Sequence, residues 1–127
     1  MREKREFLDY LVDIQEASQN IARFISGMTW DEFSQDQKRI YAVGRAFEII
    51  GEAAKKVPLS VRKRHSKVPW KQMAGMRDKL IHEYFGVNYE VLWRTAQEEI
   101  PPMPQLIAMA LEEESRKISP SPKPPKD

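Results

Sequence analysis

The sequence predicts an all-α fold, an antiparallel up-and-down bundle of four to five helices that we expect to be dimeric. Apolar residues recur at intervals of three and four along most of the chain, and no stretch alternates in the two-residue period of a β-strand. A length of 127 residues is typical of one domain with a substantial core. We therefore expect one helical domain over residues 1–117 and a disordered, proline-rich tail over residues 118–127.

The first two predicted helices are long and amphipathic. The first covers roughly residues 3–26 and ends at Gly27, and the second opens with a capping box, Ser34 with Gln37, and ends at Pro58. The first stripe contains Phe7, Leu11, Ile14, Ser18, Ile21, Ile25 and Met28, and the second contains Ile40, Val43, Phe47, Ile50, Ala54 and Val57. At 1.5 Å per residue each helix is about 35 Å long, and matched lengths favour antiparallel packing.

Two glycines lie in the interior of the second predicted helix. Gly44 and Gly51 are seven residues apart, so they share one face of the helix. Each costs about 1 kcal/mol relative to alanine. Close approach of another helix, within this chain or across a two-fold dimer, would offset that cost.

The pattern after Pro58 is weaker. Residues 59–67 are expected to form a basic loop or a short helix. A third helix is predicted from Pro69 and Trp70 to about Phe85, with Gly86 as its C-terminal cap. A fourth is predicted over residues 89–99 with Asn88 as its N-cap, and prolines 101, 102 and 104 separate it from a helical pattern over residues 105–116.

Composition excludes several functional classes. The chain has no cysteine, which removes disulfide frameworks, thiolate metal sites and cysteine nucleophiles, and its two histidines disfavour an imidazole metal site. No apolar run approaches 18 residues, and the N-terminus is too charged for a signal peptide. We therefore expect a soluble cytoplasmic protein with no membrane association, no metal and no cofactor.

The positive charge is concentrated in one segment. Seven lysines and arginines and no acidic residue lie between Lys55 and Lys71, while the rest of the chain has 14 basic and 19 acidic residues, a net charge of −5. Such a segment suits a polyanion, RNA or DNA, but it equally suits a solvated loop. Charge alone leaves both interpretations open.

The third predicted helix carries Arg77, Asp78, His82 and Tyr84, residues that could perform chemistry. At 100° per residue Arg77 and Tyr84 fall within about 20° of each other, whereas His82 lies about 140° from Arg77. One helix does not easily bring Arg77 and His82 to one point, but two such helices related by a two-fold axis could. Imidazole suits proton transfer and guanidinium suits phosphate binding. A surface His–Asp pair and a core tyrosine explain the same spacing.

The motif Arg77-x4-His82-x-Tyr84 resembles the signature of the HEPN superfamily, specifically of HepT-like toxins paired with minimal nucleotidyltransferases. The pattern becomes specific together with Gly51 and Glu52 in the second helix. Residues 42–54, residues 70–79 and the stretch from Gly86 to Trp93 also resemble the family, and the likeness covers roughly residues 5–107.

This resemblance implies a homodimeric, metal-independent endoribonuclease. Arg77 would bind the scissile phosphate of RNA, and His82 would be the general acid or base while the ribose 2′-hydroxyl attacks. Tyr84 would support the site and would accept AMP from the nucleotidyltransferase antitoxin, which silences the toxin. The basic segment, through Lys63, Arg64 and Lys67, would guide RNA toward the cleft.

Several other polar and aromatic residues have less specific interpretations. Asp78, together with Arg45, Glu48 and Glu52, could line the dimer cleft, or the last three could form the solvent face of the second helix. His65 is expected to be a surface residue. Trp30, Trp70 and Trp93 are expected to be packing anchors rather than base-stacking platforms.

Two alternatives from other classes remain open. The protein could be a non-catalytic partner that presents Tyr84 to a nucleotidyltransferase, or it could be a plain helical dimerisation module. Loss of RNA cleavage on changing His82 distinguishes the ribonuclease from both.

Overall fold

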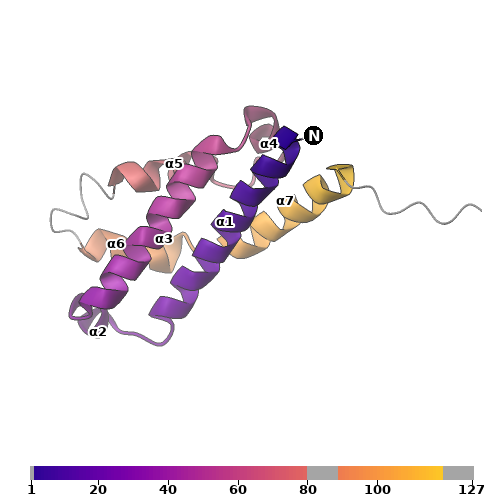
Figure 1. The fold of residues 1–127 in the computed structure, drawn as a ribbon. Helices are drawn as coiled ribbons and strands as arrows, with labels where there is room; N and C mark the ends of the chain where they lie inside the picture. Colours follow the sequence, from indigo (N-terminus) through magenta and orange to yellow (C-terminus); the bar gives the residue numbers. More distant parts are fainter. Residues whose placement is uncertain (1, 80–88, 119–127) are drawn as a thin grey trace, which may run out of the picture.

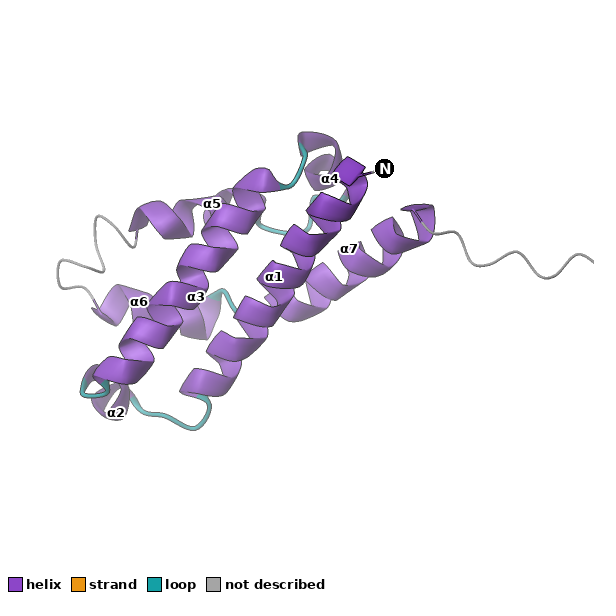
Figure 2. Cartoon of the chain, in the orientation of Figure 1, coloured by secondary structure: helices purple, strands orange, loops and turns teal. Residues whose placement is uncertain are grey.

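The computed structural model describes residues 2–79 and 89–118, and the regular elements within those ranges are all helices (Figures 1 and 2). The helices are α1 (Arg2–Ile25), α2 (Trp30–Ser34), α3 (Gln37–Lys56), α4 (Leu59–Arg64), α5 (Trp70–Lys79), α6 (Tyr89–Glu98) and α7 (Met103–Ile118). The five longer helices match the predicted bundle. Two short helices, α2 and α4, are additional, and α4 confirms the short-helix alternative for the basic segment.

Helix α1 lies at the centre of the bundle. It packs against α3 on one side and α7 on the other, and α3 in turn packs against α5 (Figure 1). The chain descends through α1 and returns through α3, as matched antiparallel helices do. This arrangement places the basic α4 and the start of α5 at the same end of the bundle as the N-terminus.

The core is formed by the predicted apolar stripes. The stripe of α3 is buried along its whole length, as are the α1 residues from Phe7 to Ile25 that the periodicity selects. Ser18, the one polar residue in the α1 stripe, is fully buried, and its hydroxyl donates to the carbonyl of Gln15 at 2.9 Å. That bond satisfies the hydroxyl inside the helix, so the polar residue does not interrupt the core.

The end of α1 and the start of α3 are each set by a capping residue. Gly27 has a φ of +73°, the left-handed conformation that glycine adopts readily after a helix, which confirms it as the end of α1. The capping box predicted at Ser34 and Gln37 is wrong. Ser34 is the last residue of α2, and α3 is capped by Asp36, whose carboxylate accepts from the amide of Arg39 at 3.1 Å.

The capping box belongs instead to α2. The hydroxyl of Thr29 accepts from the amide of Glu32 at 3.2 Å, and the Glu32 carboxylate accepts from the amide of Thr29 at 2.9 Å. This short helix buries Phe33 completely in the core. The capping box thus opens a short helix that the sequence analysis did not predict, and burial of Phe33 ties that helix to the core.

The two glycines of α3 differ in burial. Gly51 is buried and Gly44 is half-buried, although both lie in the same helix. Burial of Gly51 favours close packing within this chain over an explanation that needs a second protomer.

The C-terminal helices begin close to the predicted positions. Helix α6 ends at Glu98, and α7 begins at Met103, two residues earlier than the pattern suggested. Pro104 lies in the first turn of α7, where a missing amide hydrogen costs no intrahelical bond. The predicted cap residues Gly86 and Asn88 lie outside the described residues, as does the tail apart from Ile118, the last residue of α7.

Candidate functional site

The Arg–His–Tyr motif begins in α5. Arg77 belongs to this helix, but its side chain lies outside what the structure describes, and His82 and Tyr84 lie outside the described residues altogether. Asp78 is described and exposed, and its carboxylate lies 3.7 Å from the ammonium of Lys55 on α3. The start of the motif is thus beside the C-terminal part of α3.

The polar residues predicted as possible cleft-lining groups lie on one face of α3. Arg45, Glu48 and Glu52 are spaced by three and four, and Lys55 continues the same spacing. Arg45 is exposed and forms an ion pair with Glu48, while Glu52 is half-buried. This polar face therefore extends along α3 to the point where Lys55 meets Asp78 of the motif helix.

The structure divides the basic segment into groups with different partners. At its first end, Lys55 pairs with Asp78, and the ammonium of Lys56 lies 5.5 Å from the ring centre of Tyr10 on α1. Each of these two cations therefore contacts a neighbouring helix, α5 or α1.

Arg64 is also held by the protein. Its guanidinium donates two hydrogen bonds to Glu114 of α7, from Nε to Oε2 at 3.0 Å and from Nη2 to Oε1 at 2.9 Å. The hydrogen bond raises the pKa of Arg64 above its usual value. The same bond, opposed by burial and helped by His65, lowers the pKa of Glu114 from 4.5 to about 2. A role of Arg64 in RNA binding stays a prediction. The contact that the structure describes for its guanidinium is the ion pair with Glu114.

His65 was expected on the surface, and this expectation is wrong. Its side chain is only 9% exposed, and its Nε2 lies 2.7 Å from Oε2 of Glu114. Its carbonyl accepts from the indole nitrogen of Trp70 at 3.0 Å. The residue after the basic helix is therefore fixed between α7 and the start of α5.

Glu114 is the residue that inspection of the sequence missed. It is 2% exposed and continues the buried stripe of α7, after Ile107 and Ala110 at intervals of three and four. A carboxylate at a core position requires a cationic partner. That spacing was the available signal, but the sequence could not say that the partner lay fifty residues earlier.

A basic pocket lies between α4 and the start of α5. It has a volume of about 740 Å³. The described lining contains four cations and no acidic residue: Leu59, Arg62, Lys63, Ser66, Lys67, Val68, Pro69, Trp70, Lys71, Gln72 and Ala74. Two predicted RNA-binding residues, Lys63 and Lys67, thus line one cavity, and Arg64 is not among its lining residues.

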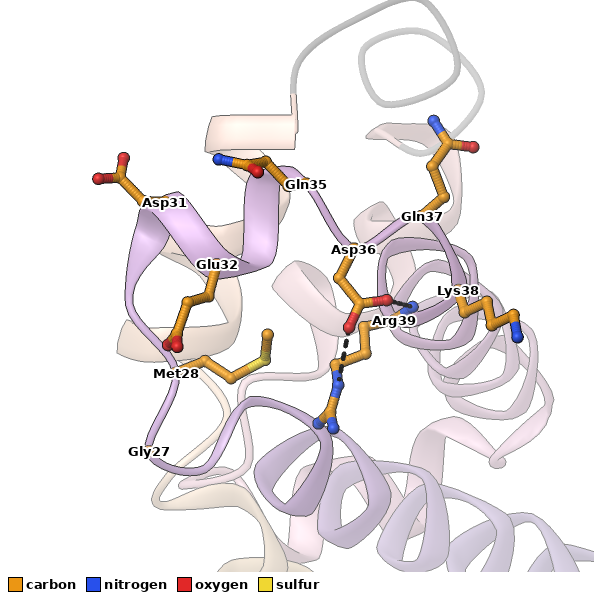
Figure 3. Close-up of a pocket in the computed structure, with 9 residues that line it drawn as sticks. All are labelled: Gly27, Met28, Asp31, Glu32, Gln35, Asp36, Gln37, Lys38 and Arg39. Carbon is orange, nitrogen blue, oxygen red and sulfur yellow. Dashed lines mark hydrogen bonds and ion pairs between the residues drawn. The ribbon is translucent and has the colours of Figure 1, made fainter.

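A second pocket of about 730 Å³ lies at the opposite end of α3 (Figure 3). Its lining mixes three acidic residues with Lys38 and Arg39. Arg39 pairs with Asp36 at 3.1 Å and also donates to the carbonyl of Phe24, so it joins the end of α1 to the start of α3. Mixed charge and internal pairing make this pocket a poorer match for a polyanion than the basic one.

The tryptophans are mainly packing residues. Trp70 is 7% exposed, and Trp93 packs against Phe33 with 4.9 Å between ring centres. Trp30 lies beside Trp93, with 6.3 Å between ring centres, and is partly exposed.

Within residues 2–79 and 89–118, no group of three acidic or histidine side chains is arranged to hold a metal ion, and no helix combines the length and apolar character needed to cross a membrane.

Known proteins with similar sequences identify the family. The model of the family described as "Ribonuclease HepT-like" matches residues 14–110. A protein named "Probable ribonuclease HepT" from Thermococcus cleftensis is 50% identical over 98 residues, which cover 77% of this chain and 89% of the relative. No solved structure matches the chain.

Two further relatives are named as candidate RNases. One, from Caldanaerobacter subterraneus subsp. tengcongensis, is 45% identical over 114 residues, which cover 90% of this chain and 99% of the relative. Another, from Methanocaldococcus jannaschii, is 47% identical over 98 residues, which cover 77% of this chain and 81% of the relative. The chain belongs to the HepT-like family of ribonucleases, which confirms the resemblance carried by its Arg–His–Tyr motif.

Proposed function

We propose that this protein is the ribonuclease toxin of a toxin–antitoxin pair and that it cleaves RNA without a metal ion. The family match carries the proposal, because the matched residues 14–110 include the whole motif from Arg77 to Tyr84. The cation-lined pocket at the start of the motif helix supports an anionic substrate.

The chemistry requires a proton acceptor, a proton donor and a phosphate ligand. His82 would remove the proton of the ribose 2′-hydroxyl, whose oxygen attacks the neighbouring phosphorus. The bond from phosphorus to the 5′ oxygen breaks, that oxygen takes a proton from an imidazolium, and a 2′,3′-cyclic phosphate and a 5′-hydroxyl remain. Arg77 would stabilise the negative charge that develops on the phosphoryl oxygens.

A homodimer would supply what one helix cannot. Arg77 and His82 diverge by about 140° around an ideal helix. A two-fold axis would let one protomer's arginine act with the histidine of its partner. The polar face of α3, with Arg45, Glu48 and Glu52, would then line the same cleft.

Regulation would act at Tyr84. A minimal nucleotidyltransferase antitoxin would transfer AMP from ATP to the tyrosine hydroxyl and release pyrophosphate. The added phosphate would lie close to Arg77, which shares a helix face with Tyr84.

The decisive experiment is RNA cleavage by the purified protein in the presence of a chelator. Wild-type protein should cleave single-stranded RNA to products ending in 2′,3′-cyclic phosphate, and His82→Ala and Arg77→Ala should each reduce the rate by at least about a hundredfold. Lys38→Ala, an exposed change on α3 away from the motif, is the matched control. Undiminished cleavage by His82→Ala would refute the assignment, and dependence on added metal would refute the mechanism.

A further inference from the structure

We propose that the pocket between α4 and α5 is an RNA-binding subsite. It holds a phosphodiester of the substrate strand that lies a few nucleotides away from the bond to be cleaved. The ligand's identity rests on the proposed ribonuclease function. The subsite is formed by Arg62, Lys63, Lys67 and Lys71, with Leu59 and Ser66.

The charge distribution of the pocket favours an anionic ligand. Four cations line one cavity whose described lining contains no carboxylate, so their mutual repulsion is not relieved by the pocket itself. The Nε of Arg62 is buried and makes no hydrogen bond in the described structure. A buried donor without an acceptor destabilises the fold, and an acceptor that reaches it relieves that cost. A phosphate in this pocket would neutralise the cluster and offer acceptor oxygens to the guanidinium.

The pocket cations differ from the other cations of the same segment in their surroundings. Lys55, Lys56 and Arg64 are engaged by Asp78, Tyr10 and Glu114 respectively. The pocket cations are drawn from the same run of sequence, yet they gather around open space. The fold thus separates cations that contact side chains of other helices from cations that line a pocket.

The apolar part of the lining suits a nucleotide better than a free phosphate ion. Leu59 is 57% exposed at this pocket, and Val68 and Pro69 also line it. These side chains can contact a ribose or a base edge. Trp70 is nearly buried and donates its indole hydrogen to His65, so the contact would not depend on tryptophan stacking.

The pocket lies at the start of the helix that carries the motif. The lining includes Trp70 and Lys71, in the first turn of α5, where the positive end of the helix dipole adds to the side-chain charge. Arg77 lies six residues after Lys71 in the same helix, about 9 Å along its axis. An RNA strand held in the pocket could therefore reach the motif within a few nucleotides.

Binding can be tested separately from cleavage with an RNA that cannot react. The probe is a short fluorescent single strand with 2′-O-methyl riboses, and its anisotropy gives the Kd of the full chain at several salt concentrations. The test variant is Lys63→Gln with Lys67→Gln. The control variant, Lys38→Gln with Arg116→Gln, removes the same charge from exposed positions outside the pocket.

The pocket variant should raise the Kd about 20-fold near 0.1 M salt and reduce the slope of log K against log salt by about 1.4, or 0.7 for each phosphate that the protein no longer neutralises. The control should change the Kd by less than about threefold. Equal weakening by both variants would overturn the subsite, because it would show an effect of net charge alone. An unchanged Kd in the pocket variant would overturn it as well.

Cleavage of unmodified RNA, measured in parallel, separates the two proposals. If the wild-type protein cleaves RNA and the pocket variant binds the probe as tightly as wild type, the ribonuclease proposal is supported and the subsite is refuted. If the wild-type protein cleaves no RNA but probe binding is weakened only in the pocket variant, the subsite is supported and the ribonuclease proposal is refuted.

Discussion

Arg64 and Glu114 form a two-point ion pair that joins α4 to α7 across fifty residues of sequence. The carboxylate is almost fully buried, and His65 contacts it as well. Removing Arg64, whose side chain is 41% exposed, would leave the buried carboxylate without its main cationic partner. The pair therefore fixes where the basic helix lies on the bundle, and through His65 and Trp70 it also fixes the start of the motif helix.

Glu114→Gln should destabilise the fold. The amide keeps the size of the side chain but loses its charge and one of its acceptor oxygens, so we expect the free energy of unfolding to fall by about 2 kcal/mol. Urea denaturation measures the loss. Glu112→Gln, at the exposed Glu112–Arg116 pair on the same helix, is the control and should stay within about 0.5 kcal/mol of wild type. Equal losses in the two variants would contradict a special role for Glu114.

The same carboxylate predicts how stability depends on pH. Its pKa in the folded state is about 2, below the 4.5 of the free group, so its stabilising contribution is complete above about pH 4.5. That contribution is lost as the pH falls from about 4.5 toward 2, because the unfolded chain takes up the proton first. Wild-type stability should fall across this window more steeply than that of Glu114→Gln. Parallel acid-unfolding curves for the two proteins would show that another group is responsible.

Arg64 and Lys63 are neighbours with opposite expected phenotypes. Arg64→Gln should reduce the free energy of unfolding by about 1–2 kcal/mol and change the salt slope of RNA binding little, because its guanidinium is bound to Glu114. Lys63→Gln should leave stability unchanged and reduce the slope by about 0.7. Denaturation and anisotropy measured on both variants decide the matter. If Arg64→Gln kept wild-type stability but reduced the salt dependence of RNA binding, Arg64 would be an RNA-binding residue rather than a structural one.

Features of the fold that depend on contacts between residues close in sequence could be predicted, whereas features that depend on contacts between distant residues could not. The stripe from Ile40 to Val57 was readable because core burial repeats with the period of the helix, and Gly27 was readable because a left-handed cap favours glycine. The cap predicted at Ser34 was wrong because Thr29 and Asp36 satisfy the same local rules and cap α2 and α3 instead, and α2, which buries Phe33, includes Ser34 as its last residue.

The candidate site was less predictable because its charges are sorted by tertiary contacts. Nothing local distinguishes Arg64 from Lys63, yet one reaches Glu114 and the other lines a cavity. The polar face of α3 could be placed on the helix, but its approach to Asp78 through Lys55 required the packing of α3 against α5. The roles of Arg77, His82 and Tyr84 stay predictions based on the family.

A shared active site predicts that two inactive variants restore activity to each other. Arg77→Ala and His82→Ala should each be inactive as homodimers, but a mixed dimer retains one intact arginine and one intact histidine across its two-fold axis. An equal mixture should recover up to about a quarter of wild-type RNA cleavage, since half of the dimers are mixed and half of their sites are intact. Sedimentation should give a dimer of about 30 kDa, twice the 14.9 kDa chain. A fully active monomer, or no recovery in mixtures shown to exchange subunits, would refute the shared site.

AMP transfer to Tyr84 should silence the enzyme by competing for Arg77. The transferred group carries a phosphate that would bind the guanidinium proposed to hold the phosphate of RNA, and its adenosine would fill the cleft. After co-expression with the nucleotidyltransferase, mass spectrometry should find AMP on Tyr84 in wild type and in His82→Ala, but none on Tyr84→Phe. Tyr84→Phe should keep part of its RNA cleavage and should no longer respond to the antitoxin. Tyr41, which is 59% exposed on α3, provides the matched control, because Tyr41→Phe should still be modified and silenced. AMP on another residue would refute the switch at Tyr84 but not the ribonuclease proposal, because that proposal assigns catalysis to Arg77 and His82.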